Sequence, residues 1–361
     1  MRKKLYKKIV TAICCVTMLC AFGACNKAED GKNTDAGASN VEDTTALTTT
    51  PEATATPEAT ATPEPTATPA PTPTQAVHVP AQNESVMIPR EYVKFNKDFL
   101  GKIVDINYTT HAYYGDGSEI TKHAYVYLPP EYDENKQYNV LYLMHGVGGD
   151  EYEWEMHKSF SEVKLALDNL IYHGDIEPFI VVIPNGRSCV EYTDKSMENA
   201  NSFYEFGKEL RNDLIPYIEA NFATYAEYDE NGYDLTATRD HRAMAGLSMG
   251  AMQTINIGIC ECLDIISYFG AFSAAPTTYN AQTIAEKLQN FEEYDIHYFY
   301  NICGLSDTGS LQAGGDAVKG LSDLTDKVKE DVNMVYQTVN GGHTMSVWKL
   351  GLYNFAQIVF E

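Results

Sequence analysis

The chain is poor in basic residues and in cysteine. It has 26 Lys and Arg against 50 Asp and Glu among 361 residues, a formal net charge of −24. This balance argues against a nucleic-acid partner, because a protein that binds a polyanion needs a basic face to release counterions. The eight cysteines are too sparse for a disulfide scaffold. A hydrophobic content of 44% and an aromatic content of 11% instead predict an acidic protein that is globular over most of its length.

The N-terminus has the build of a secretory signal. Basic residues among the first eight precede the apolar run Ile9–Phe22, which is too short to span a bilayer comfortably as a helix. The run ends in Phe-Gly-Ala-Cys, which resembles a bacterial lipobox with Cys25 as the lipidated residue, although phenylalanine stands where leucine is usual. We predict a signal peptide over residues 1–24 and an exported, cell-surface lipoprotein anchored to the bacterial membrane through Cys25. The alternative is a plain secretory signal with a chance cysteine.

Residues 25–85 have the composition of an unfolded stalk. They are rich in Thr, Pro, Ala and Glu, contain no aromatic residue, and repeat the hexads PEATAT, PEATAT, PEPTAT and PAPTPT from Pro51 to Thr74. This proline content favours extended polyproline II over random coil. We predict a disordered spacer that holds a domain away from the membrane. A recognition tract for a proline-binding partner is the alternative, and the sequence does not decide whether the threonines are glycosylated.

Strand and helix patterns alternate over residues 86–361, a length that suits one large domain. Apolar, β-branched runs predict strands at Lys102–Tyr108, His123–Leu128, Val140–Met144, Phe179–Ile183, Arg242–Ala245, Tyr268–Phe272, His297–Ile302 and Met334–Val339. Helical periodicity predicts helices at Phe160–His173, Phe203–Phe222, Met249–Glu261, Ala281–Gln289, Asp316–Glu330 and Ser346–Val359. The alternation predicts an α/β fold with a mostly parallel central sheet and helices on both faces. The first two strands should form an antiparallel edge hairpin, and Pro216 should kink its helix.

One motif carries the chemistry. The pattern G-x-S-x-G at Gly246–Gly250 follows a predicted strand and precedes a predicted helix, the context that a nucleophile elbow requires. The turn strains the backbone of Ser248, so side chains at Gly246 and Gly250 would clash. In return, the Ser248 hydroxyl is exposed at the carboxyl edge of the sheet, above a helix N-terminus that favours negative charge. The alternative is a glycine-rich turn with a surface serine.

A serine nucleophile needs a base and an acid, which this fold supplies in the order Ser, acid, His. Asp307 follows the strand His297–Ile302, and of the nine histidines only His343 lies beyond it, again after a strand end. We therefore predict that His343 accepts the Ser248 proton and later protonates the leaving alcohol, while Asp307 orients the imidazole. The alternative acids fall within a helical pattern that favours a solvated face: Asp316, Asp323 and Asp326.

The oxyanion of the reaction also needs hydrogen-bond donors. One should be the backbone N–H of Met249, the residue after the nucleophile. The other should come from the glycine-rich loop His145–Gly149 after the third predicted strand, where we choose the N–H of Val147. For His145 itself, a structural role in bracing this loop is preferred over catalysis.

Four stretches resemble the esterase D and carbohydrate esterase family 1 group of α/β-hydrolases: His145–Trp154, Ile183–Asn185, Leu214–Glu219 and His241–Gly250. Closer still, Ser273–Pro276, Cys303-Gly304, Gly341–His343 and Val347–Lys349 are similar to the feruloyl esterase domains of bacterial xylanases. The match extends over nearly all of residues 90–360 and includes the three triad positions. The resemblance implies hydrolysis of feruloyl or acetyl esters on plant-wall xylan, without a metal or an organic cofactor. The same fold also hosts acetylxylan esterases, mycolyltransferases and thioesterases, so the acyl group stays open.

The chain departs from the family pattern at two places. Ala251 stands where the family usually has a third glycine behind the elbow. The stretch Ala226–Thr238 looks longer than is usual before the elbow strand. It is either a surface hairpin without a role, which we favour, or a flap on the substrate side.

Several residues keep two interpretations. The two tryptophans, Trp154 and Trp348, lie close in sequence to site loops, and each either contacts the substrate or packs in the core. No cysteine spacing suggests zinc, and we expect free, mostly buried thiols at Cys189, Cys260, Cys262 and Cys303. The whole protein is either a cell-surface serine esterase or a surface carbohydrate-binding lipoprotein with an idle hydrolase fold. The complete triad favours the esterase, whereas the oligomeric state is not indicated.

Overall fold

The computed structural model describes residues 85–229 and 232–361. The signal peptide predicted over residues 1–24, the lipidated Cys25 and the stalk predicted over 25–85 lie outside the described residues, except for Ser85. No helix in the described part of the chain combines the length and the apolar character needed to cross a membrane.

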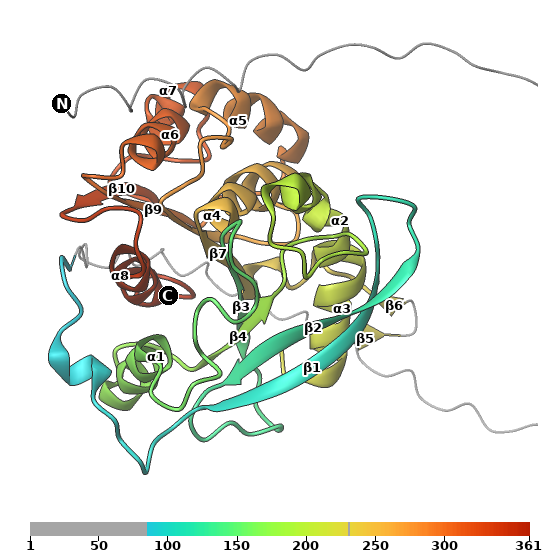
Figure 1. Cartoon of the computed structure of the whole chain (residues 1–361), viewed down its shortest axis with the longest axis vertical. Helices are drawn as coiled ribbons and strands as arrows, with labels where there is room; N and C mark the ends of the chain where they lie inside the picture. Colours follow the sequence, from blue (N-terminus) through green and yellow to red (C-terminus); the bar gives the residue numbers. More distant parts are fainter. Residues whose placement is uncertain (1–84, 230–231) are drawn as a thin grey trace, which may run out of the picture. The chain divides into compact units, whose positions relative to one another are not determined.

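The core of the domain is an eight-stranded sheet (Figure 1). Its strands in spatial order are β1 (Lys102–His111), β2 (Glu119–Leu128), β4 (Phe179–Pro184), β3 (Asn139–Met144), β7 (Arg242–Leu247), β8 (Tyr268–Phe272), β9 (Tyr298–Gly304) and β10 (Met334–Val339). The strands β4, β3, β7, β8, β9 and β10 run parallel to one another, while β1–β2 and β2–β4 are antiparallel. The predicted mostly parallel sheet with an antiparallel edge hairpin is therefore confirmed.

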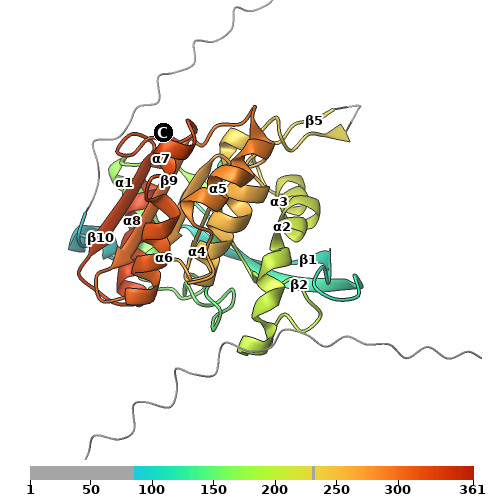
Figure 2. The ribbon, with the colours of Figure 1, turned by 90° about the horizontal axis from the view of Figure 1, so that it is seen from above.

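Helices cover both faces of this sheet (Figures 1 and 2). The helices are α1 (Glu162–His173), α2 (Phe206–Glu209), α3 (Ile215–Asn221), α4 (Met249–Gln253), α5 (Ala281–Leu288), α6 (Thr308–Val318), α7 (Leu321–Leu324) and α8 (Met345–Ala356). Helices α1 and α8 pack on one face, and α2 to α7 contribute to the apolar core on the other.

The sequence of β3 shows how one strand contributes side chains to the apolar cores on both faces of the sheet. Successive side chains of a strand point to opposite faces of a sheet, and a parallel sheet buried on both sides therefore needs a continuous apolar run. Val140 and Tyr142 join the core under α2 to α7, whereas Leu141 and Leu143 join the core under α1 and α8. All four side chains are at most 1% exposed.

Three predicted helices differ from the structure. The predicted helix Met249–Glu261 is divided into α4 and a π-helical segment, Thr254–Ile259. The predicted helix Phe203–Phe222 is divided into α2, a π-helical segment Leu210–Leu214 and α3. Pro216 lies directly after the π-helical segment, where the backbone stays helical from Leu214 into α3 and the Ile215 N–H donates to the Leu210 carbonyl. The proline therefore stands where the regular α-helical bonding is interrupted.

The predicted helix Asp316–Glu330 is wrong. Helix α6 begins at Thr308, directly after Asp307, and the chain turns at Gly320 in a left-handed conformation with φ of +73° before the short α7. Glycine is a poor helix former, so the glycines in α6 weaken its sequence signal. The four described cysteines are free and buried, as expected: Cys189, Cys260, Cys262 and Cys303.

The long stretch Ala226–Thr238 forms a small hairpin, β5 (Tyr228–Asp229) and β6 (Gly232–Tyr233), outside the main sheet. The guanidinium of Arg242, the first residue of β7, donates to the Leu235 carbonyl at 2.5 Å and to Thr238 Oγ1 at 2.6 Å. The stretch is therefore fixed at the amino end of β7, the end opposite to Ser248. Of the two interpretations, the structure shows a surface hairpin and not a flap beside the nucleophile.

Candidate active site

Ser248 lies on a sharp turn between β7 and α4. Its φ of +54° and ψ of −112° are strained for a residue with a side chain. A Cβ on Gly246 would lie 2.6 Å from the carbonyl carbon of Gly250, and a Cβ on Gly250 would lie 2.7 Å from Met144 Cβ. The turn therefore needs glycine at both positions, as the elbow interpretation expects.

The structure brings the three predicted triad residues together. His343 Nε2 lies 3.0 Å from Ser248 Oγ, and His343 Nδ1 lies 2.7 Å from Asp307 Oδ2. Ser248 and Asp307 are 8% and 9% exposed, whereas the His343 side chain is 42% exposed. The imidazole thus meets solvent, with a buried carboxylate behind it. A nucleophile, a base and an orienting acid in this contact order are the arrangement of serine acyl-transfer catalysis.

Two neighbouring loops hold the acid and the base. Asp307 follows β9, and His343 follows β10, the next strand of the sheet. The N–H of Ser306 donates to the carbonyl oxygen of Gly341 at 2.8 Å. A Cβ on Gly304 would lie 2.5 Å from that same oxygen, so glycine lets the loops approach closely enough for the carboxylate to reach the imidazole.

Asp307 is the carboxylate that reaches His343. Within residues 85–229 and 232–361, none of the alternative acids contacts His343: Asp316, Asp323 and Asp326. The same part of the chain contains no group of three or more His, Cys, Asp or Glu side chains placed to hold a metal ion.

Two residues that the sequence did not assign to the site touch this pair. Ser310 Oγ in the first turn of α6 lies 3.3 Å from His343 Nδ1, and Cys303 Sγ lies 3.9 Å from Asp307 Oδ2. Burial, together with the Asp307 charge, raises the pKa of the Cys303 thiol to about 11. The thiol therefore stays protonated at neutral pH and is a weak donor toward the carboxylate. Cys303 belongs to a stretch that resembles the family, but the sequence assigned neither residue a role in the site.

The expected oxyanion donors lie beside the nucleophile. A Cβ on Gly146 would lie 3.3 Å from Ser248 Cβ, which places the glycine-rich loop against the elbow. The side chain of Val147 packs on a small apolar cluster that includes Met249 and Phe203. In the described part of the chain, the N–H groups of Val147 and Met249 have no hydrogen-bond partner. Both are therefore free to donate to a ligand oxygen.

His145 braces this loop, as preferred from the sequence. Its Nδ1–H donates to the Gly146 carbonyl at 2.7 Å, while the N–H of Gly186 donates to its Nε2 at 2.9 Å. The Gly146 carbonyl and the Val147 N–H belong to one trans peptide and point in opposite directions. The His145 bond therefore fixes the direction in which the Val147 N–H donates.

Arg187 is a site residue that sequence reasoning missed. Its guanidinium donates to the carbonyl oxygen of Gly149 at 2.9 Å and also to that of Val147, and it lies 4.8 Å from the ring of Phe203. Arginine presents several donors in a rigid plane, so one side chain can hold two carbonyls. The sequence signal that could have identified Arg187 is its place as a charged residue just after β4, at the carboxyl edge of the sheet.

A buried ion pair supports the segment that carries Arg187. Lys122 is fully buried, and its Nζ lies 2.6 Å from Glu209 Oε1. The same Nζ donates to the carbonyls of Asn185 and Arg187 at 2.8 and 2.7 Å, and Ser188 Oγ donates to Glu209 Oε2 at 2.6 Å. A buried charge is tolerated when it is paired and hydrogen-bonded, and here these bonds fix the backbone around residue 187.

The two tryptophans have structural positions. Trp154 has no exposed surface and donates its indole N–H to the Met144 carbonyl at 3.0 Å, so of its two interpretations the structure shows packing in the core. Trp348 is 7% exposed and packs its ring against the His343 imidazole. Sequence proximity to a loop could not tell whether either indole faces inward.

Comparison with known proteins gives an esterase match over part of the chain. Residues 119–296 match the family model described as putative esterase. Endo-1,4-beta-xylanase Y of Acetivibrio thermocellus is 38% identical over 171 residues, 47% of this chain. An endo-1,4-beta-xylanase/feruloyl esterase of Xylanibacter ruminicola is 30% identical over 284 residues, 74% of this chain. The chain spans 14% and 33% of the length of these two relatives.

Solved structures share the fold. A feruloyl esterase module from Clostridium thermocellum, a serine-to-alanine mutant complexed with sinapinate, is 27% identical with a TM-score of 0.60, covering 76% of this chain and 93% of that one. A ferulic acid esterase of carbohydrate esterase family 1 from Anaeromyces mucronatus is 23% identical with a TM-score of 0.59, covering 76% and 97%. Residues 119–296 thus match this esterase family, and the domain has the α/β-hydrolase architecture and is similar to feruloyl esterases, including one of carbohydrate esterase family 1.

Proposed function

We propose that the protein is a serine esterase that hydrolyses feruloyl esters on plant-wall xylan through an acyl-enzyme intermediate. The observation that carries the proposal is the chain of contacts from Ser248 Oγ through His343 to Asp307, at 3.0 and 2.7 Å, on a strained elbow turn. This geometry suits acyl transfer, because the base lies within hydrogen-bond distance of the hydroxyl it must activate.

In the first half of the reaction, His343 Nε2 takes the hydroxyl proton while Ser248 Oγ attacks the ester carbonyl carbon. The carbonyl oxygen gains negative charge and is stabilised by the N–H groups of Met249 and Val147. When the tetrahedral intermediate collapses, the protonated His343 gives its proton to the departing alcohol oxygen. Asp307 stabilises the imidazolium that forms between these two transfers.

In the second half, water replaces the alcohol. His343 Nε2 removes a proton from this water, whose oxygen attacks the acyl carbonyl carbon. The same two N–H groups stabilise the second oxyanion, and the bond between the acyl carbon and Ser248 Oγ breaks as the serine regains a proton from His343. The products are a free carboxylic acid and the unmodified enzyme.

The names of the relatives support the substrate. One relative is named as an endo-1,4-beta-xylanase/feruloyl esterase, and one structural neighbour is a feruloyl esterase module complexed with sinapinate. Both point to a hydroxycinnamoyl ester on xylan, and the acetyl ester of xylan is the alternative.

The experiment is a comparison of turnover on methyl ferulate and on acetylated xylan. We expect the larger kcat/KM on methyl ferulate and no measurable turnover of either substrate by the Ser248→Ala variant. Ser322→Ala, a serine of α7 remote from the elbow, is the matched control. A preference for acetylated xylan would replace the feruloyl assignment by acetylxylan esterase. A folded wild-type protein that binds xylan but hydrolyses neither substrate would support the idle binding lipoprotein.

We also propose the organisation of the whole chain: a signal peptide over residues 1–24, lipidation at Cys25, a stalk over 25–85 and an esterase domain over 86–361. The lipobox pattern and the proline hexads support this arrangement. We expect wild-type protein in the membrane fraction of a bacterial host and the Cys25→Ala variant outside it. A Cys25→Ala variant that stays wholly with the membrane would refute the lipid anchor.

A further inference from the structure

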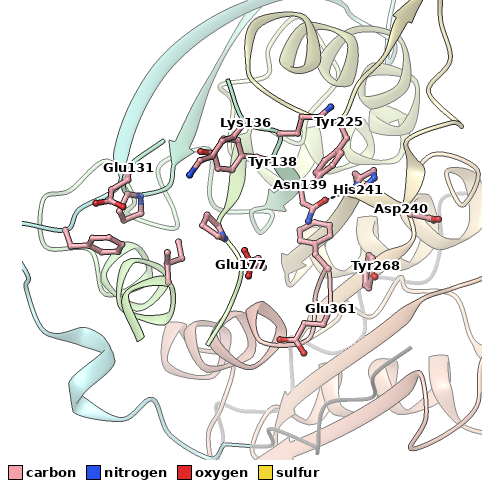
Figure 3. A pocket seen from close by; sticks show the side chains of 16 residues that line it. Glu131, Lys136, Tyr138, Asn139, Glu177, Tyr225, Asp240, His241, Tyr268 and Glu361 are labelled. Carbon is pink, nitrogen blue, oxygen red and sulfur yellow. Dashed lines mark hydrogen bonds between the residues drawn. The ribbon is translucent and has the colours of Figure 1, made fainter. Parts of the chain in front are cut away.

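A cavity lies at the edge of the sheet opposite to the triad, and Figure 3 shows the side chains that line it. It has a volume of about 530 Å³, within the range of ~300–1,000 Å³ that small-molecule sites occupy. Its walls include Asn139 and Tyr268, the first residues of β3 and β8, and His241, which precedes β7. Ser248 follows the other end of β7, and a six-residue strand is about 20 Å long. The cavity is therefore separate from the catalytic residues.

Flat aromatic and amide groups form part of this cavity. The rings of Tyr225 and His241 stack with centroids 3.6 Å apart and an angle of 7° between their planes. His241 Nδ1 lies 2.7 Å from Asn139 Oδ1, which keeps the imidazole in place beside the amide. Further aromatic residues contribute to the lining: Phe99, Tyr138, Tyr268 and Phe360. Figure 3 shows Tyr225, His241 and Asn139 side by side.

The rim carries negative charge. Four acidic side chains border the cavity against a single lysine, Lys136: Glu131, Glu177, Asp240 and Glu361. Burial lowers the pKa of His241, so its ring adds no positive charge near neutral pH. Such a rim repels anionic ligands, and a polar rim of this kind does not suit a purely apolar ligand.

We infer that this cavity is a second carbohydrate-binding site, which takes a neutral, unsubstituted oligosaccharide segment of the xylan backbone. A pyranose ring has an apolar face of C–H groups and an edge of hydroxyls. Aromatic rings accept the face, while amides and carboxylates such as those of Asn139 and Glu177 bond to the edge. The choice of xylan as the polysaccharide rests on the proposed function.

The position of the cavity determines which part of the polymer it can hold during catalysis. With the two sites on opposite edges of the sheet, this cavity holds a different chain segment from the one whose ester is cleaved. A second contact with an insoluble polymer raises the effective concentration of esters near Ser248.

The experiment measures binding of unsubstituted xylohexaose to the full-length wild-type protein by titration calorimetry. Xylohexaose carries no ester, so neither catalysis nor its absence affects the readout. We expect saturable binding that Tyr225→Ala weakens about tenfold, because one stacked ring is lost. Tyr225→Phe keeps the ring and should bind within about threefold of wild type.

A second variant keeps the proposal testable if Tyr225→Ala does not fold. Glu177 is exposed, so Glu177→Ala should fold normally and weaken binding about threefold through a lost hydrogen bond. The proposal is overturned if xylohexaose does not bind at millimolar concentration, or if Tyr225→Ala binds it as wild type does. It is also overturned if spermidine binds and xylohexaose does not, which would make the cavity a cation site. Turnover of methyl ferulate tests the esterase proposal separately.

Discussion

The indole of Trp348 meets the imidazole of His343 edge to face, with ring centroids 4.9 Å apart and an angle of 84° between the planes. Trp348 is buried in α8, the helix that begins just after the histidine loop. A half-exposed imidazole on a loop needs a rigid neighbour if its Nε2 is to stay within 3.0 Å of Ser248 Oγ. The geometry therefore makes Trp348 a positioning residue for the base.

Replacing Trp348 by leucine should separate positioning from substrate contact. We expect kcat on methyl ferulate to fall about tenfold or more with KM little changed, because only the placement of the base is lost. Steady-state kinetics measure the two constants. Leu352→Ala, a buried change in the same helix, is the control, and it should reduce stability without this loss of kcat. An increase in KM alone would show that Trp348 contacts the substrate instead.

Arg187 should matter for catalysis although it lies outside the triad. A lysine at this position has a single ammonium and cannot hold the carbonyls of Val147 and Gly149 in one plane. We expect Arg187→Lys to lower kcat at least tenfold, since one misplaced oxyanion donor costs about 3 kcal/mol. Arg211→Lys, which weakens a peripheral pairing with Asp264, is the matched control. Equal kcat in the two variants would contradict the role of Arg187 in holding the carbonyls of Val147 and Gly149.

His145 should make the fold sensitive to acid. Burial lowers its pKa to about 3, whereas an unfolded histidine titrates near pH 6.5. Between these values the unfolded chain binds a proton that the folded chain does not, so the free energy of unfolding decreases as the pH falls, on the order of 1 kcal/mol per unit. The His145→Asn variant keeps a donor for the Gly146 carbonyl but cannot titrate.

Urea denaturation at several pH values between 6 and 4 measures this effect. The slope of unfolding free energy against pH should be smaller in His145→Asn than in wild type, by about one proton. The slopes are compared instead of the absolute values, because the variant also loses the acceptor for the Gly186 N–H. Identical slopes would mean that the folded state does protonate His145 in this range.

The elbow glycines should be irreplaceable for stability. A Cβ on Gly250 would lie 2.7 Å from the His145 carbonyl oxygen, a backbone atom that cannot move aside cheaply. We expect Gly250→Ala to destabilise the fold by about 3 kcal/mol or more, at the upper end of overpacking. A Cβ on Gly148 would meet nothing within 4 Å, so thermal unfolding of Gly148→Ala should stay close to wild type. Equal melting temperatures of the two variants would contradict the close packing of the elbow.

The sequence predicted the triad because each member follows the end of a strand. The elbow pattern identifies Ser248, chain order leaves His343 as the single base, and Asp307 follows the strand between them. These are local signals combined with a known topology. The strands of the sheet were also predictable from local signals, because each one is a continuous apolar run in the sequence.

The supporting contacts could not be predicted in this way. Arg187 binds carbonyls 38 and 40 residues away, and no local pattern states which backbone groups a loop arginine will meet. Trp154 lies as close in sequence to a site loop as Trp348 does, yet its indole points into the core. The cavity at the amino ends of the strands combines residues from separate segments of the chain, so it exists only once the sheet has formed.

Covalent labelling tests the central claim most directly. A fluorophosphonate reacts with a serine hydroxyl that a neighbouring base has activated, and mass spectrometry of the digested protein identifies the labelled residue. We expect one label per chain, on Ser248, and a loss of methyl ferulate hydrolysis in proportion to the labelled fraction. Hydrolysis that persists in fully labelled protein, or a label on another residue that abolishes it, would contradict the account.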